Sequence, residues 1–219
     1  MFSQIDKSFD LLKYLNTEEY QEITSFKFKK SDIIYNEGDL PLGLYFIKKG
    51  YIGLTRLSVS GNETLLRVFS PKYFFGHRSL MAGEAYHANA TALVACEVVF
   101  IPKEIFSKII KKDNSLLLFL AQILAKELRV AENKFSSLAS SKVTARIVQT
   151  LAFLRTKYPE YKWTRKEIGE YCGAKTETVS RVLTILEEQG LINKNGRNIE
   201  ILNFEDLYSF AHKLEENNS

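Results

Sequence analysis

Three polar side chains in the segment KTETVSR, residues 175–181, have the types and the spacing needed to contact DNA bases from one helix face. Arg181 can donate two hydrogen bonds to guanine O6 and N7, and Glu177 can accept one from the amino group of cytosine. Ser180 can bond to several bases. The alternative is a plain i,i+4 ion pair between Glu177 and Arg181, which stabilises an exposed helix by about 0.3 kcal/mol.

The helix that carries these residues has two opposite faces. Its apolar residues recur at i, i+3, i+4 and i+7, the spacing of a stripe that packs on a core. They are Val179, Val182, Leu183 and Leu186. A polar set follows the same spacing shifted by two residues, which at about 100° per residue places it roughly 200° from the apolar stripe. This set, expected to face away from the core, is Glu177, Ser180, Arg181 and Thr184.

Flanking signals predict a winged helix-turn-helix. The preceding helix begins with Thr164, and Glu167 three residues later completes a capping box, in which each side chain bonds to the other residue's backbone N–H. Gly173 suits the tight turn between the two helices. Asn195 and Gly196 predict a β-hairpin with a type I′ turn, which needs positive φ at both residues. The second helix of such a module lies in the DNA major groove.

Positive charge gathers on this predicted module. Residues 140–200 contain eleven Lys and Arg against seven Asp and Glu, whereas residues 201–219 contain one Lys against four acids. Contacts to phosphates position a protein on DNA without specifying the sequence. The residues expected to make them are Thr164, Arg165, Lys166, Lys175, Thr178, Lys194 and Arg197.

The front half of the chain has the pattern of an antiparallel β-roll. Between about residues 24 and 102, short runs rich in branched and aromatic residues, such as LYFIKKG and CEVVFI, alternate with turn signals such as NEGD and SGN. Residues 1–23 are expected to form short helices, and PKEIFSKIIKK predicts an amphipathic helix after Pro102. The predicted fold class is α+β, with the roll in residues 1–112 and the winged helix-turn-helix in residues 140–219.

A long helix is expected to begin at Asp113 and to end near Ser137. Apolar residues repeat along it at alternating spacings of three and four, which is the seam of a helical dimer. A second apolar strip, formed by Leu116, Phe119, Leu120 and Ile123, suits packing on the helix's own domain, and the alternative is that both strips are core. The polar segment SSLASSK, residues 136–142, predicts a hinge, so that residues 113–139 form a dimerisation helix and hinge. The seam consists of Ala121, Leu124, Leu128, Ala131, Phe135 and Leu138.

Composition and motifs exclude several classes of protein. Hydrophobic residues make up 45% of the chain and charged residues 26%, as in globular proteins, and the net charge of +4 permits a nucleic-acid partner. Two cysteines make no disulfide framework, and the most apolar stretch, SLLLFLAQILA, is shorter than the roughly 20 residues of a bilayer span. These features predict a cytoplasmic protein without membrane contact. The chain has no P-loop, Gly-x-Ser-x-Gly motif or metal-type histidine cluster, so neither catalysis nor a metal site is expected.

The chain resembles the Crp/Fnr family of bacterial transcription regulators over nearly its whole length. YNEGDLPLGLYFIKKGYIGL is similar to the opening strands of a cyclic-nucleotide-binding β-roll, FFGHRSL to its phosphate-binding cassette, and TRKEIGEYCGAKTETVSRVLTILEEQGLI to the family's helix-turn-helix. The resemblance implies a homodimer that binds double-stranded DNA and contacts RNA polymerase. Within the family, ETVSR is similar to the Fnr branch, which goes with palindromic TTGA-type sites. The base-contacting residues that this implies are Thr176, Glu177, Ser180 and Arg181.

The sensor half departs from the patterns of that family. Four cysteines hold the iron–sulfur cluster of Fnr, and the two in this chain fall in different domains, so no such cluster is expected. His77 follows Gly76 where a cyclic-AMP cassette has glutamate, and Tyr86 or His87 stands at its arginine position. Cyclic AMP binding by the usual contacts is therefore not expected. The effector is unidentified, and its expected pocket is Gly76, His77, Arg78, Ser79, Leu80, Tyr86, His87, Ala88 and Asn89.

Three other hypotheses about the function of the sensor half stay open. His77 and His87 are a candidate pair of haem or metal ligands. The roll can instead serve as a sensor module that acts through protein contacts. A DNA-binding protein without any effector is the third possibility, and its pocket is then filled by Tyr73, Phe74, Phe75 and Leu80.

Overall fold

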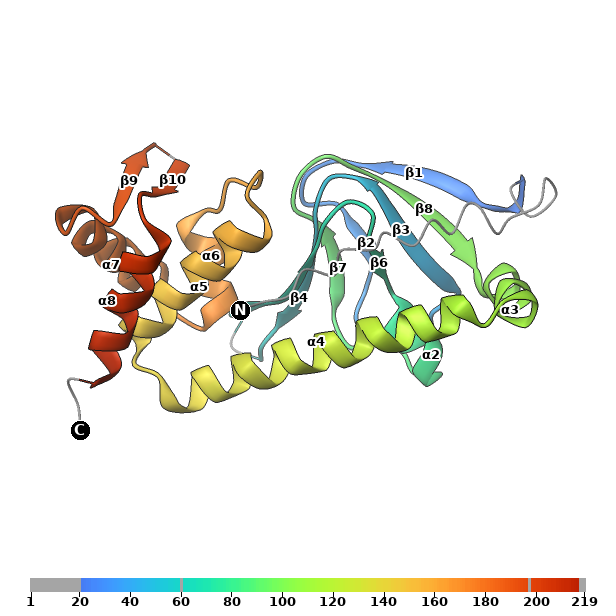
Figure 1. Ribbon diagram of the computed structural model, residues 1–219. Helices are drawn as coiled ribbons and strands as arrows, with labels where there is room; N and C mark the ends of the chain where they lie inside the picture. Colours follow the sequence, from blue (N-terminus) through green and yellow to red (C-terminus); the bar gives the residue numbers. More distant parts are fainter. Residues whose placement is uncertain (1–20, 60, 197, 217–219) are drawn as a thin grey trace. The chain divides into compact units, whose positions relative to one another are not determined.

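The computed structural model describes residues 21–59, 61–196 and 198–216 (Figure 1). The short helices expected in residues 1–23 lie outside these ranges apart from residues 21–23. Two compact units make up the chain, one ending at Leu128 and the other beginning at Arg129. Over the described ranges, no helix combines the length and the apolar character needed to cross a membrane.

The first unit is built on two four-stranded antiparallel sheets, as the alternation of strand and turn signals predicts (Figure 1). One sheet has the order β1 (Thr24–Phe28), β8 (Cys96–Pro102), β3 (Gly43–Lys49) and β6 (Phe74–Phe75). The other has the order β2 (Ile33–Tyr35), β7 (Asn89–Ala92), β4 (Ile52–Leu57) and β5 (Glu63–Phe69). Neighbours in each order are mostly distant in sequence, so the roll depends on long-range pairing.

Aromatic and branched side chains fill the roll. Ile47, Ile52 and Val98 are fully buried, and each such side chain stabilises the fold by about 1.5–3 kcal/mol. Tyr35 and Tyr86 stack with their ring centroids 3.6 Å apart, although 51 residues separate them in the sequence. Phe75 lies against the same pair, 6.0 Å from the ring of Tyr35.

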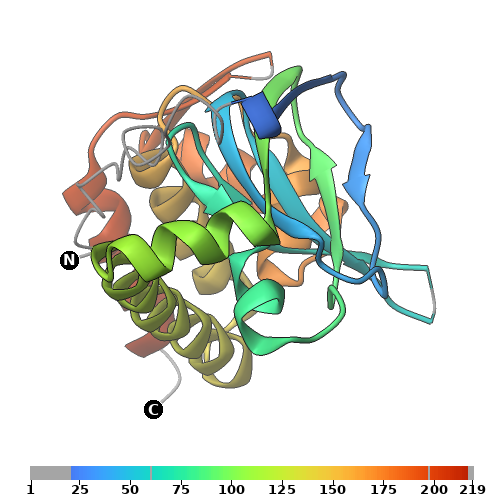
Figure 2. The ribbon, with the colours of Figure 1, turned by 90° about the vertical axis from the view of Figure 1, so that its right-hand side faces the viewer.

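The helices of this unit that lie wholly within the described residues are α2 (His77–Ala82), α3 (Lys103–Lys112) and α4 (Ser115–Ser140). The predicted amphipathic helix after Pro102 is confirmed as α3. The second apolar strip of α4 packs on the unit's own core, as expected, with Leu116, Leu120 and Ile123 buried and Phe119 packed against them. Glu127, which was not expected there, is buried on the same side of the helix. In both views α2 lies beside α4 (Figures 1 and 2).

The ends of α4 differ from the prediction. Asp113 is extended and precedes the helix, because its carboxylate accepts a hydrogen bond from the backbone N–H of Ser115 at 2.8 Å. The predicted hinge at residues 136–142 is wrong for its first five residues, since α4 continues to Ser140. Ser140 Oγ donates to the Ser136 carbonyl at 2.8 Å, so serine here bonds within the helix and does not break it. The chain leaves the helix at residues 141–142.

The second unit carries α5 (Val143–Lys157), α6 (Arg165–Cys172), α7 (Thr176–Glu188), the hairpin β9 (Ile192–Asn195) and β10 (Asn198–Ile201), and α8 (Phe204–Glu216). The predicted order of helices and hairpin is confirmed. Sequence alone did not predict α8, whose Leu207 and Ala211 are buried at 0% and 2% exposure. Packing against α5 secures this last helix.

Candidate nucleic-acid interface and effector pocket

The predicted capping box fixes the start of α6. Thr164 Oγ1 accepts a hydrogen bond from the backbone N–H of Glu167 at 3.2 Å, and Glu167 Oε2 accepts one from the backbone N–H of Thr164 at 2.8 Å. Tyr161 adds a hydroxyl donor to the other oxygen of Glu167 at 2.6 Å. The box therefore holds both the helix start and a buried carboxylate.

The turn between α6 and α7 depends on two glycines. Gly173 has φ 66°, the left-handed conformation in which glycine costs least. Gly169 matters for a different reason, because a Cβ added there would lie 2.4 Å from the backbone oxygen of Ala174. The Gly169 carbonyl also accepts the Ala174 N–H at 2.9 Å. Sequence reasoning identified Gly173 and missed Gly169, although a glycine inside a helix pattern is a signal of close packing.

The two faces of α7 are separated as predicted. The apolar stripe is at most 2% exposed, while Glu177, Arg181 and Thr184 are exposed and Ser180 is half-buried. In the part of the chain that the structure describes, Glu177 and Arg181 form no ion pair with each other. The outer ends of both side chains are thus available to a partner.

The wing differs in detail from the prediction. Asn195 pairs with Asn198 as the last residue of β9, so it belongs to the strand and not to the turn that was expected to begin there. Gly196 has φ 60°, the left-handed conformation in which glycine costs least. Asn195 does not adopt positive φ, contrary to the expected type I′ turn. The predicted phosphate contact Arg197 lies outside the described residues.

Lys194 joins the wing to α7. Its Nζ lies 2.8 Å from Glu187 Oε2 and 3.2 Å from Thr184 Oγ1, and its backbone N–H donates to Glu187 Oε1 at 3.0 Å. Hydrogen bonds from Lys194 hold the pKa of Glu187 below its usual value. Lys194 is therefore already engaged, and we name this group of Thr184, Glu187 and Lys194 the wing clamp.

The other residues expected at phosphates lie at the starts of α6 and α7. Arg165 and Lys175 are exposed, whereas Thr164 and Thr178 are half-buried. Lys166 is exposed and pairs with Glu170 at 3.2 Å. Of these cations, Arg165 and Lys175 are the better phosphate candidates because no acid holds them within the described chain.

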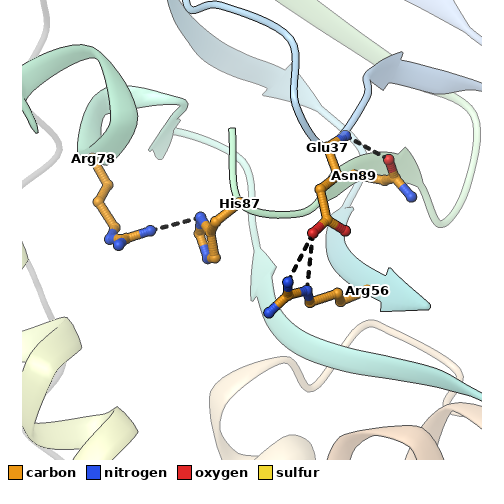
Figure 3. A network of polar contacts seen from close by, with 5 residues as sticks. All are labelled: Glu37, Arg56, Arg78, His87 and Asn89. Carbon is orange, nitrogen blue, oxygen red and sulfur yellow. Dashed lines mark hydrogen bonds and ion pairs between the residues drawn. The ribbon is translucent and has the colours of Figure 1, made fainter. Parts of the chain in front are cut away.

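A network of polar contacts includes three of the residues predicted for the pocket, Arg78, His87 and Asn89 (Figure 3). Arg78 Nη1 donates to His87 Nδ1 at 2.6 Å. Burial, together with the charges of Arg78, Arg67 and Arg56, lowers the pKa of His87. The lowered pKa favours the neutral imidazole, whose Nδ1 can accept a hydrogen bond from the Arg78 guanidinium.

Two members of this network escaped the sequence analysis. Arg56 on β4 bonds to Glu37 Oε1 at 3.0 Å, and the Glu37 backbone N–H donates to Asn89 Oδ1 at 2.7 Å (Figure 3). No local pattern marks Glu37 or Arg56, since the contact depends on the pairing of distant strands. Asn89, which was predicted as a pocket residue, is thus connected to Arg56 through Glu37.

The remaining predicted pocket residues do not gather at one place. Tyr86 and Ala88 belong to the core cluster of Ile47 and Phe75. Leu80 instead packs against the cluster of α3 and α4, and lines an open pocket of about 440 Å³ with Phe106 and Ser107. Ser79 is buried and donates its hydroxyl to the Ala85 carbonyl at 3.3 Å, and the space at Gly76 is bordered by Tyr45 and Tyr86.

His77 faces a residue that was not predicted. It is 1% exposed, and its Nε2 lies 3.3 Å from Glu127 Oε2 on α4. His77 and His87 thus contact different partners. In the ranges that the structure describes, no group of three or more His, Cys, Asp or Glu side chains is arranged to hold a metal ion.

Both units match known families. Residues 25–113 match the cyclic nucleotide-binding domain, and residues 145–210 match the Crp-like helix-turn-helix domain. The chain is 32% identical to the cAMP-activated global transcriptional regulator CRP of Salmonella typhimurium over 185 residues, which are 80% of this chain and 88% of the relative. The chain belongs to the Crp/Fnr family. It is also 33% identical to the cAMP-activated global transcriptional regulator Vfr of Pseudomonas aeruginosa, over 78% of this chain and 86% of Vfr.

Solved structures support the same assignment. FixK2 from Bradyrhizobium japonicum superposes with a TM-score of 0.77 at 26% identity, covering 88% of this chain and 97% of FixK2. TTHA1359, a CRP/FNR family regulator from Thermus thermophilus, gives a TM-score of 0.72 at 25% identity, covering 87% and 100%. The predicted family and α+β fold are confirmed, and this Crp/Fnr protein is a transcription regulator with a helix-turn-helix DNA-binding domain.

Crp-family regulators act as dimers, so the exposure of the predicted seam on α4 bears on where a second copy could pack. Leu128 and Phe135 are 60% and 74% exposed, and Leu124 is half-buried. Ala121 and Ala131, which belong to the same strip, are also exposed. Leu138 is 45% exposed. A Cβ added at Gly173 would lie 3.2 Å from Leu138 Cδ2, so Leu138 also lies against the turn of its own helix-turn-helix.

The contact between Arg78 and His87 can be tested by titration. Arg78→Gln removes a charge that disfavours the imidazolium, so the pKa of His87 is expected to rise, with burial still holding it below the usual histidine value. NMR of the imidazole protons resolves this, because the chain has three histidines. Arg129→Gln, an exposed arginine on α4, is the control. An unchanged pKa in Arg78→Gln contradicts the contact.

Proposed function

We propose that this Crp/Fnr regulator binds a palindromic TTGA-type site as a homodimer, with α7 in the major groove. The main support for this proposal is that α7 has two opposite faces. Glu177 and Arg181 are exposed on one face, and the apolar residues of the other face are at most 2% exposed. A helix fixed by its core face presents its polar face in one orientation, and contact with base edges needs that precision. RNA polymerase is proposed as a partner from family membership alone.

Selection of binding sites from random double-stranded DNA tests this proposal. The wild-type protein is expected to enrich two inverted TTGA-type half-sites whose centres lie about 34 Å apart, one turn of the double helix. Enrichment of a single half-site contradicts binding as a dimer. Enrichment of an unrelated sequence contradicts the Fnr-like interpretation of residues 177–181.

The homodimer is tested by a charge in the seam. Leu128→Glu would bring two carboxylates into an apolar interface, a cost of several kcal/mol. Sedimentation is expected to show a dimer for the wild type and a monomer for the variant. Leu118→Glu is the matched control, because Leu118 is 62% exposed on the same helix but outside the seam. A dimer that survives Leu128→Glu places the interface elsewhere.

We also propose that a small effector binds beside α2 and gates DNA binding. Arg78 supports this, since its partner in the described chain is an imidazole and not a carboxylate, so no acid compensates the guanidinium charge there. An effector with an anionic group would supply that charge. Cyclic AMP, named for the Salmonella relative, is not proposed, because His77 occupies the position after Gly76 and bonds to Glu127.

A further inference from the structure

Glu127 is an acid in an apolar strip. The residues of α4 that face the β-roll recur at i, i+4, i+7 and i+11, and Glu127 is the fourth, after Leu116, Leu120 and Ile123. It is 7% exposed. Burying a carboxylate there costs free energy unless other groups compensate its charge. The groups that contact Glu127 therefore indicate the role of this residue.

Two partners from different elements meet at this carboxylate. Arg67 on β5 forms an ion pair with Glu127 Oε2, and His77 on α2 approaches the same oxygen at 3.3 Å. Burial favours a raised pKa, but the hydrogen bonds and charges of His77 and Arg67 outweigh it and hold the pKa of Glu127 below its usual value. One ionised group thus joins β5, α2 and α4.

The cluster is incompletely satisfied. Glu127 Oε1 and His77 Nδ1 are buried and have no hydrogen-bond partner in the described chain. The 3.3 Å separation is also longer than the 2.7–2.9 Å typical of a charge-assisted hydrogen bond. Partly satisfied buried networks are costly, so a small shift of α2 that improves or breaks these bonds changes the free energy of the cluster appreciably.

Two of its members also adjoin the pocket network. His77 directly precedes Arg78, which bonds to His87, and both belong to the six-residue helix α2. The charge of Arg67 acts on His87 as well as on Glu127. Anything that binds Arg78 and His87 therefore acts on the same short helix and on the same arginine as the Glu127 cluster.

The third member lies on the helix that both units share. The boundary between the units follows Leu128, yet α4 is continuous from Ser115 to Ser140. Glu127 immediately precedes Leu128 of the predicted seam. A change in how Glu127 is held is thus applied to the helix within the dimer seam itself.

We propose that His77, Glu127 and Arg67 form an ionic latch through which the state of α2 and the adjoining pocket sets the docking of α4 and, through it, the affinity for DNA. The readout by DNA affinity rests on the proposed function. The latch itself is a property of the first unit, and hydrogen exchange measures it without DNA.

A double-mutant cycle on the full chain tests the latch. His77→Gln removes the imidazole and Glu127→Gln removes the carboxylate charge of this contact, and each is expected to change the DNA Kd by about fivefold or more in the same direction. The double variant is expected to match a single one, because residues that act through one contact are not additive. Glu132→Gln, an exposed acid on α4, is the control and is expected to leave the Kd unchanged.

Hydrogen exchange and melting separate the latch from a general loss of fold. Glu127→Gln is expected to speed exchange in both residues 77–82 and residues 115–140. Glu127→Leu fills the apolar strip, and Arg67, whose side chain is 27% exposed, can turn toward solvent. This variant is expected to reproduce the change in Kd with a melting temperature no lower than that of Glu127→Gln, because it buries no unpaired polar group at position 127.

Three outcomes overturn the latch. They are Kd values within about twofold of wild type for both single variants, multiplicative effects in the double variant, or exchange in residues 77–82 that ignores Glu127→Gln. Wild-type protein that fails to bind any DNA contradicts the proposed function instead, and the exchange experiment then still decides the latch.

Discussion

Arg181→Ala is expected to weaken specific DNA binding by roughly 1–3 kcal/mol for each contacted base and to relax discrimination at one position of each half-site. Arg181 is exposed on α7, and the structure gives it no ion pair with Glu177, so its guanidinium is free to donate to a guanine. Two half-sites double the effect. Binding-site selection with the variant measures both the lost affinity and the position that has become permissive.

Arg165→Ala is the matched control for this experiment. Arg165 is an exposed cation at the start of α6, and its loss is expected to weaken all sequences equally and to lower the salt slope by about one per protomer. Lys166 suits this comparison less well because Glu170 already pairs with it. If Arg181→Ala loses affinity equally for all sequences, Arg181 contacts phosphate and the TTGA assignment falls.

Gly169→Ala is expected to unfold or severely loosen the DNA-binding unit. In an ordinary helix this substitution stabilises by up to about 1 kcal/mol. Here the new Cβ meets the Ala174 backbone oxygen at 2.4 Å, and a backbone atom cannot turn aside as a side chain does. Overpacking typically costs about 1–3 kcal/mol, and separation of α6 from the turn removes the specific DNA contacts as well. The single tryptophan, Trp163, is 2% exposed in this unit and reports its unfolding by fluorescence.

Gly190→Ala separates this steric effect from ordinary glycine strain. Gly190 has φ 67°, but a Cβ there meets nothing within 4 Å. The expected cost is about 1–2 kcal/mol, with DNA binding retained. Equal melting curves for Gly169→Ala and the wild type contradict the close approach of α6 and the turn.

Features set by neighbours in sequence were the ones that sequence could predict. The capping box of Thr164 and Glu167 spans three residues, and the opposed faces of α7 follow from one helical period. Both are present, because local geometry decides them before tertiary packing acts. The antiparallel roll was predictable as a class from its alternating strands and turns, though not its pairing order.

The pocket shows where such reasoning stops. Glu127 contacts His77 across 50 residues, and no local period relates the two positions. A warning was nevertheless present, since Glu127 continues the spacing of Leu116, Leu120 and Ile123. The hinge failed for a different reason, because serine is as able to bond back to its own helix as to end it.

The wing clamp has a consequence for attempts to retarget the protein. Thr184, Glu187 and Lys194 tie the second half of α7 to β9, whereas Glu177 and Arg181 lie before the clamp and take no part in it. Exchanging residues 176–181 for those of another regulator should therefore transplant a new sequence preference as a cassette. A longer graft that crosses residue 184 would have to bring a matching wing, because replacing Thr184 and Glu187 removes the groups on α7 that Lys194 of the hairpin holds.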